Sequence, residues 1–161
     1  MALKGVPAFY LPALLASEND IKSFSMTGQR RDLNREKFKL DNLVSVLNNP
    51  ESNANKNIKY LGNAMDIRSK LEQFHPSSEM ECLSKGRSDI VVIKRGKGPK
   101  SVFAIHNMTE NKINYQLDDY DLPELIDNDF NMKDFLASTK YNWKNISLDP
   151  FQVIWLGSLM K

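Results

Sequence analysis

The most regular pattern of apolar and polar positions lies in the first half of the chain. Apolar residues there step by four, three, four and three positions, a spacing that places them along one face of an α-helix. The stripe consists of Tyr60, Ala64, Ile67, Leu71 and Phe74. The pattern predicts a helix from about Asn53 to Gln73 that packs its stripe against a sheet or barrel wall, and Pro76 lies just past its end.

A strand and a second helix are predicted before this long helix. The apolar run near the N-terminus predicts a buried strand at about Ala8–Tyr10, and residues 16–35 are predicted to form a polar loop without sustained periodicity. A short helix from about Asn42 to Leu47 follows, with Asp41 as its expected N-cap. Strand, loop and helices together make one βα unit, to which we assign residues 1–76.

The pattern changes after Pro76 to short apolar runs separated by turn residues. Asp89–Lys94 and Ser101–Met108 flank a basic, glycine-containing turn and predict a β-hairpin. Further strands are predicted at Ile113–Leu117, Asn142–Leu148 and Phe151–Leu156, the last two paired across Asp149-Pro150, and an acidic loop at Asp118–Asn128. Residues 77–161 are therefore predicted to form a small antiparallel β domain.

Composition narrows the class of protein without assigning a function. A chain of 161 residues with 41% hydrophobic and 26% charged residues is typical of a soluble globular protein. The net charge of +2 is too small to predict a nucleic-acid partner. The single cysteine, Cys82, excludes an intrachain disulfide, and with two distant histidines it makes a zinc site improbable on composition.

The N-terminal apolar run is not expected to direct the chain to a membrane. Pro7 and Pro12 interrupt the helix that a signal-peptide core needs, and the run is too short to span a bilayer. We therefore predict a cytoplasmic protein without a membrane partner.

A polar cluster at Thr27–Phe38 is the strongest candidate for a functional site. Gly28 is followed within a few residues by several arginine and amide side chains and by the carboxylate of Asp32. A buried core does not need so many polar side chains in one short segment. Arginine is a planar fork of donors, and aspartate is its matching bidentate acceptor. Because α/β barrels place ligand contacts in the loops after their strands, this position favours ligand binding.

The cluster and its surroundings resemble the sucrose phosphorylase-like branch of the α-amylase superfamily, which includes phosphorylases acting on glucosylglycerate. The Arg-Asp-x-Asn-Arg core with its upstream apolar run is the most specific part. The resemblance extends over nearly the whole chain and covers the C-terminal part of those longer enzymes. It is carried by Gly5–Asp20, Thr27-Gly28, Arg31–Arg35, Ile67-Arg68, Phe74–Pro76 and Asp149–Leu156.

The resemblance implies an α+β fragment, namely the last βα unit of a (β/α)8 barrel followed by a C-terminal antiparallel β domain. The implied activity is retaining glucosyl transfer between a glucoside, such as sucrose or glucosylglycerate, and phosphate, without metal or organic cofactor. In the family, the catalytic carboxylates lie on earlier barrel strands. We therefore expect the isolated chain to be inactive, to bind glucoside and phosphate only when the rest of the barrel is supplied, and to associate through its barrel-facing surface.

The resemblance also suggests roles for residues of the motif. Arg31 is expected to donate hydrogen bonds to sugar hydroxyls, although it could instead form a structural pair with Asp32. Asp32 is expected to orient an arginine, and Asn34 and Arg35 to tie the loop to the following helix. Arg30 is expected to be solvated, with an approach to phosphate as the alternative.

The sequence is also compatible with two other functions. The chain could be the tail of an α-amylase-type hydrolase or transglucosidase, or a free-standing β module used for binding or assembly. Trp143 and Trp155 could stack on a sugar, but a place in the β-domain core is favoured. His75 and His106 are expected to cap or pack rather than to catalyse.

Overall fold

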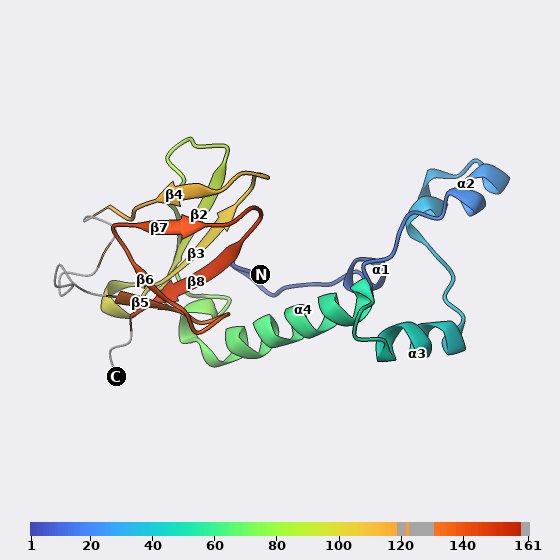
Figure 1. Ribbon diagram of the computed structural model, residues 1–161, viewed down its shortest axis with the longest axis horizontal. Helices are drawn as coiled ribbons and strands as arrows, with labels where there is room; N and C mark the ends of the chain where they lie inside the picture. The colour runs from blue at the N-terminus through green and yellow to red at the C-terminus, as the bar shows by residue number, and fades with distance from the viewer. Residues whose placement is uncertain (119–121, 123–130, 159–161) are drawn as a thin grey trace. The chain divides into compact units, whose positions relative to one another are not determined.

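The computed structural model describes residues 1–118, 122 and 131–158, and they form two compact units (Figure 1). One unit comprises Pro7–Met65, and the other comprises Met1–Val6 together with Asp66–Lys161. The helices are α1 (Leu11–Leu14), α2 (Ile21–Thr27), α3 (Leu40–Asn48) and α4 (Asn53–Lys70), with short 3-10 helices η1 (Arg30–Asn34), η2 (Glu72–Phe74) and η3 (Gly98–Lys100).

The second unit is built on antiparallel strands. Its larger sheet has the strand order β1-β2-β3-β8-β5-β6, and β4 and β7 form a separate two-stranded sheet. All of the strand pairs are antiparallel. The strands are β1 (Met80–Cys82), β2 (Ile90–Arg95), β3 (Val102–Asn107), β4 (Ile113–Tyr115), β5 (Asn131–Asp134), β6 (Lys140–Asn142), β7 (Ile146–Leu148) and β8 (Val153–Gly157).

One face of the larger sheet contributes to the main hydrophobic core. Alternate residues of β2, β3 and β8 point to this face because side chains alternate along a strand. They pack with residues of β5, β7 and the intervening turns. The cluster contains Leu83, Ile90, Val92, Phe103, Ile105, Leu117, Met132, Trp143, Ile146, Leu148, Ile154 and Leu156.

The opposite face is covered around Phe74, which lies in η2. The ring of Phe74 stacks at a tilt on that of Trp155 in β8, with the ring centroids 4.6 Å apart. The guanidinium groups of Arg68 and Arg95 lie 5.3 and 5.5 Å from the centre of the Phe74 ring. Both arginines are buried.

These two arginines hold the first residues of the chain. Arg68 donates hydrogen bonds to the carbonyl oxygens of Met1 and Gly5, and Arg95 donates to those of Ala2 and His75. Burial lowers the pKa of both guanidinium groups, but arginine stays protonated in proteins. The N-terminal segment is therefore fixed to the sheet unit by charge-assisted hydrogen bonds.

Several predictions of secondary structure are confirmed. The two predicted helices correspond to α3 and α4, and the predicted hairpin corresponds to β2 and β3. Trp143 and Trp155 are buried in the β unit, as expected for core residues. No helix among the described residues is long and apolar enough to cross a membrane. Most of the predicted acidic loop at 118–128 lies outside the described residues.

The predicted strand at Ala8–Tyr10 is wrong. These residues have no regular secondary structure, and α1 begins at Leu11. A strand requires a neighbour that accepts and donates its backbone hydrogen bonds, and no described strand pairs with residues 8–10. The predicted polar loop at 16–35 also contains helical structure, because Asp20 caps α2 and Gly28 ends it.

Two further details differ from expectation. Asp41 lies in the first turn of α3, whereas the N-cap is Lys39, which makes no side-chain cap. The two C-terminal strands do not pair with each other. A turn at residues 143–144 divides the predicted strand between β6 and β7, and β7 pairs with β4 whereas β8 pairs with β3 and β5. The pairing partners of β8 are therefore distant in sequence, which a local pattern does not indicate.

A glycine substitution tests the packing of β8. A Cβ atom added at Gly157 would lie 2.4 Å from Cε2 of Phe135, so Gly157→Ala forces the aromatic ring to move. We expect the free energy of unfolding to fall by about 1–3 kcal/mol, measured by urea denaturation followed through tryptophan fluorescence, since both tryptophans lie in this unit.

Gly62→Ala is the matched control. Gly62 lies inside α4 with nothing within 4 Å of an added Cβ. Because alanine favours a helix over glycine, this variant should not lower the unfolding midpoint. An unchanged midpoint for Gly157→Ala would contradict the described packing of Phe135 on β8.

Candidate functional site

The Arg-Asp-x-Asn-Arg motif lies on the short 3-10 helix η1, directly after α2. The carboxylate of Asp20 begins α2 by accepting hydrogen bonds from the hydroxyl of Ser23 at 2.6 Å and from its backbone N–H at 2.9 Å. These two bonds lower the pKa of Asp20. Gly28 ends α2 at a φ of 66°, a left-handed conformation that glycine adopts without strain, and its N–H donates to the Phe24 carbonyl.

Within η1, Asp32 is held and Arg31 is free to reach outward. The Asp32 carboxylate accepts a hydrogen bond of 2.5 Å from the Thr27 hydroxyl. Nε of Arg31 lies 3.9 Å from the same carboxylate, and the Arg31 side chain is 65% exposed. At that distance and exposure the ion pair contributes little stability, so the guanidinium keeps most of its donors available.

The end of η1 is tied to the segment before α1. The hydroxyl of Tyr10 donates a hydrogen bond of 2.5 Å to the backbone carbonyl of Asn34. The N–H of Arg35 donates to the Asp32 carbonyl, and the N–H of Asp20 donates to the Leu33 carbonyl at 2.8 Å. The geometry of the motif thus depends on backbone contacts that the sequence pattern did not indicate.

The remaining motif residues are found at the surface. Arg30, Asn34 and Arg35 are exposed. Among the residues that the structure describes, the side chains of Asn34 and Arg35 make no hydrogen bond to α3, so their role in tying the loop to that helix stays a prediction. The roles of Arg31 and Asp32 toward a ligand likewise stay predictions.

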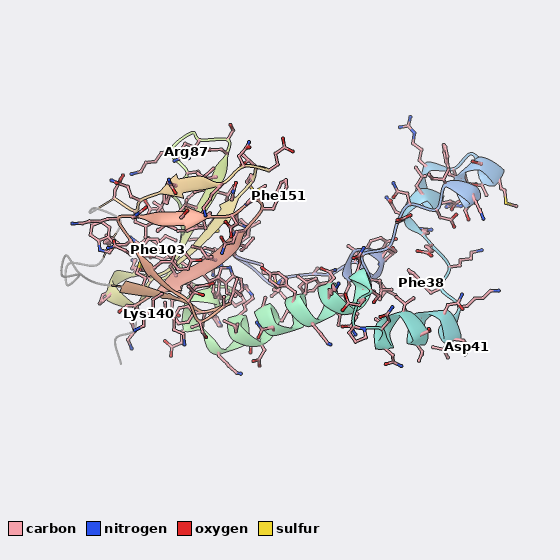
Figure 2. The ribbon with its side chains drawn as sticks, viewed as in Figure 1. Phe38, Asp41, Arg87, Phe103, Lys140 and Phe151 are labelled. Atoms are coloured by element: carbon pink, nitrogen blue, oxygen red, sulfur yellow. The ribbon has the colours of Figure 1, made fainter. Side chains whose placement is uncertain are left out.

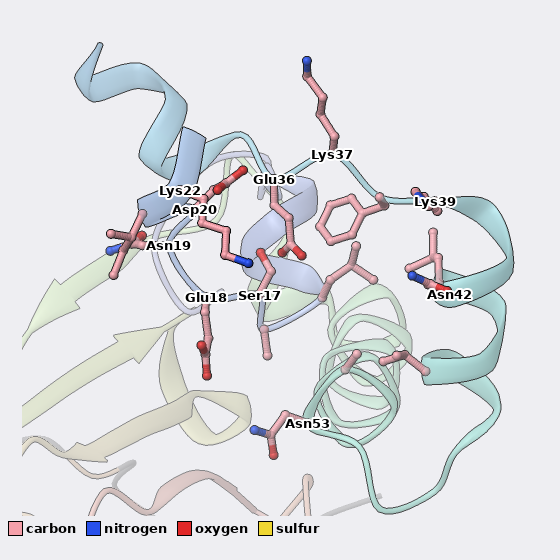
Figure 3. Close-up of a pocket in the computed structure, with 17 residues that line it drawn as sticks. Ser17, Glu18, Asn19, Asp20, Lys22, Glu36, Lys37, Lys39, Asn42 and Asn53 are labelled. Carbon is pink, nitrogen blue, oxygen red and sulfur yellow. The ribbon is translucent and has the colours of Figure 1, made fainter. Parts of the chain in front are cut away.

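The same unit contains a hollow of about 980 Å³ (Figure 3). Its walls come from residues 15–22, residues 36–39 and the N-terminal turns of α3 and α4. Leu15, Phe38 and Leu43 supply apolar surface, and Glu36, Asp20 and Lys22, labelled in Figure 3, supply charged groups to its lining. Arg31 is not among its lining residues, so the hollow and the motif are adjacent in sequence but separate.

The two histidines of the chain lie in surroundings that favour a structural role. His106 lies in β3, where burial is the main cause that lowers its pKa, and His75 is exposed after η2 with its Nδ1 near the Ser77 hydroxyl. Within the described ranges, no group of three or more histidine, cysteine or acidic residues is arranged to hold a metal ion.

Comparison with characterised proteins places the chain. It is 31% identical over 110 residues to a glucosylglycerate phosphorylase from Allomeiothermus silvanus, a match that covers 68% of this chain and 20% of the relative. It is 20% identical over 156 residues to a glucosylglycerate phosphorylase from Escherichia coli, covering 97% of this chain and 26% of the relative. No protein-family model matches the chain.

The chain corresponds to a C-terminal part of a sucrose phosphorylase-like protein of the α-amylase superfamily. Solved structures agree on the fold. An Anoxybacillus α-amylase superposes with a TM-score of 0.52 at 18% identity over 70% of this chain and 25% of its own. The trehalulose synthase of Pseudomonas mesoacidophila superposes with a TM-score of 0.53 at 12% identity over 71% of this chain and 19% of its own.

The solved structures support the α+β class with an antiparallel β domain, and the curated relatives are glucosylglycerate phosphorylases. The chain spans about a fifth to a quarter of the length of the curated relatives it matches. The activity of a whole protein of this kind is therefore a proposal for this chain.

The Tyr10 contact provides a test of the site geometry. In the described part of the chain, the Tyr10 hydroxyl makes the only side-chain hydrogen bond from the segment before α1 to η1. Tyr10→Phe removes this bond. Losing one such bond costs about 0.5–1.5 kcal/mol, so amide exchange of residues 30–35 should become roughly two- to tenfold faster by hydrogen-exchange mass spectrometry. Exchange in β3 should not change, and unchanged exchange in η1 would show that the Tyr10 bond does not hold the motif.

Proposed function

We propose that this chain is the part of a retaining glucoside phosphorylase that carries a glucosyl-binding arginine and the C-terminal β domain. The proposed reaction is glucosyl transfer between a glucoside, such as glucosylglycerate or sucrose, and phosphate. The observation that carries the proposal is the 31% identity to a glucosylglycerate phosphorylase over 110 residues. The exposed guanidinium of Arg31 on the Arg-Asp-x-Asn-Arg motif supports it.

The proposed role of Arg31 fits its chemistry. A guanidinium stays charged and presents several donors in a fixed plane, so it can donate directed hydrogen bonds to neighbouring hydroxyls of one sugar ring. Asp32, held by the Thr27 hydroxyl, would limit the movement of η1 without neutralising Arg31 by a close ion pair. Arg31 would then bind and orient the glucosyl unit and take no part in bond breaking.

Retaining glucosyl transfer also requires a carboxylate nucleophile and a carboxylic acid on opposite sides of the glycosidic bond. We propose that these groups lie on barrel strands outside the present chain. The first unit would complete the barrel through its apolar surface, where Ile21 and Leu40 are 66% and 73% exposed. Exposed apolar groups of this size favour association with another surface.

The isolated chain should therefore not turn over glucosides. We expect no glucose 1-phosphate when the purified chain is incubated with phosphate and either sucrose or glucosylglycerate, measured by product chromatography. Turnover that persists through repurification and is lost in Arg31→Ala would contradict the proposed location of the carboxylates.

In an enzyme completed by fusion to the N-terminal part of a related phosphorylase, Arg31 should matter for glucosyl transfer. Arg31→Ala removes a charged hydrogen bond worth roughly 1.5–3 kcal/mol, which lowers kcat/KM by about ten- to a hundredfold. Arg31→Lys should restore only part of the loss because the planar fork is absent.

Arg30→Ala is the matched control for these kinetics. Arg30 is the exposed neighbour on the same 3-10 helix, and its removal should change kcat/KM for the glucosyl donor little. If Arg30→Ala lowers kcat/KM and Arg31→Ala does not, the glucosyl-binding arginine is Arg30 and the proposed role of Arg31 is wrong. Free glucose as the main product in the presence of phosphate would instead favour a hydrolase.

A further inference from the structure

The β unit contains a second hollow, of about 350 Å³, that the proposed glucosyl transfer does not use. Its volume is at the lower end of the range for small-molecule sites. It is lined by buried Leu83, by the turns before β2 and β7 and by the residues around β4. Arg87, labelled on the β unit in Figure 2, belongs to its wall.

Three carboxamide side chains line this hollow, Asn114, Gln116 and Asn145. They are exposed, and none of the three amides has a hydrogen-bond partner among the described residues. A carboxamide offers two donors and a carbonyl acceptor, which complements a hydroxyl group, itself both donor and acceptor. Three unpaired amides around one hollow therefore match a ligand that is rich in hydroxyls.

Arg87 and Tyr115 form one wall of the hollow. The Arg87 guanidinium lies 5.7 Å from the centre of the Tyr115 ring, and it is fixed by two hydrogen bonds to the Asp89 carboxylate, of 2.9 and 2.5 Å. The ring of Tyr115 also packs against the hydrophobic core. Since the Arg87 guanidinium lies over the Tyr115 ring and the core packs against that ring, this wall is held in place and loses little entropy when a sugar ring lies against it.

The charges around the hollow argue against an anionic ligand. Arg87 is paired with Asp89, and Lys85 is paired with Asp118. The Lys144 ammonium lies 4.9 Å from the centre of the Trp143 ring. Because carboxylates already neutralise Arg87 and Lys85, an anion would have to compete with Asp89 and Asp118 for these two cations.

We propose that this hollow is a binding site for a neutral saccharide, separate from the Arg31 motif. The amides of Asn114, Gln116 and Asn145 bind the hydroxyl groups, and the Tyr115–Arg87 wall contacts the ring. The site serves to hold a sugar on the β unit and performs no chemistry. The inference rests on the β unit alone and does not depend on the proposed glucosyl transfer.

The test is a titration of the 161-residue chain, labelled with nitrogen-15, with sucrose as the probe. The side-chain NH₂ resonances of Asn114, Gln116 and Asn145 should shift and reach saturation as sucrose is added. The backbone amide resonances of η1 report separately on binding at the Arg31 motif. Asn145→Ala and Gln116→Ala should each weaken binding about two- to tenfold. Asn63→Ala, an exposed carboxamide on α4, should leave the dissociation constant unchanged.

Three outcomes would overturn the proposal. Shifts that stay linear with sucrose concentration would show that the hollow does not bind a saccharide. Saturable shifts with sodium phosphate at constant ionic strength, but not with sucrose, would make it an anion site. Saturable shifts confined to η1 would assign the sugar to the Arg31 motif alone, which would support the proposed function while removing this second site.

Discussion

The burial of both faces of β3 is the constraint on which the sheet unit depends. Of its six residues, all but His106 are buried. A strand that is covered on both sides needs two separate layers of apolar groups. One comes from β4, β7 and the neighbouring turns, and the other from Phe74 with Trp155 and the N-terminal segment. Residues from opposite ends of the sequence therefore stabilise the same strand.

The cover on the second face is unusual because two arginines, not apolar side chains, complete it. Arg68 and Arg95 are buried, and each donates its hydrogen bonds to backbone carbonyls of residues 1–5 or 75. A buried charge is costly unless its donors are satisfied. Carbonyl acceptors and the face of the Phe74 ring offset part of that cost, while Nε of Arg95 is buried without a hydrogen-bond partner among the described residues. These directed hydrogen bonds fix the backbone of residues 1–5 at three carbonyl groups.

The sequence predicted elements whose signal is local and failed where the deciding contacts are distant. The long helix and the β2–β3 hairpin depend on neighbouring residues, and both were predicted. The helix ends at Lys70, however, so Phe74 of the predicted stripe lies in η2, and Tyr60 of the stripe is 51% exposed. The strand order was not predictable in the same way, because β8 pairs with β3 and β5 across gaps of many residues. At the site, the resemblance indicated Arg31, but nothing in the pattern indicated that Tyr10 would bond to Asn34 from 24 residues away. The hollow beside Tyr115 was also missed, since two of its amides come from β4 and the residue after it and the third from the turn before β7.

The central claim is that Arg31 donates hydrogen bonds to the glucosyl unit. Its most direct test compares Arg31 and Arg31→Ala, in the completed enzyme, on a series of glucosides that each lack one hydroxyl group. If the claim holds, the loss of kcat/KM caused by Arg31→Ala will largely disappear for the deoxyglucoside that lacks the partner hydroxyl, since the two changes remove the same interaction. An equal loss for every deoxyglucoside would contradict it and leave Arg31 as a residue that only shapes its loop.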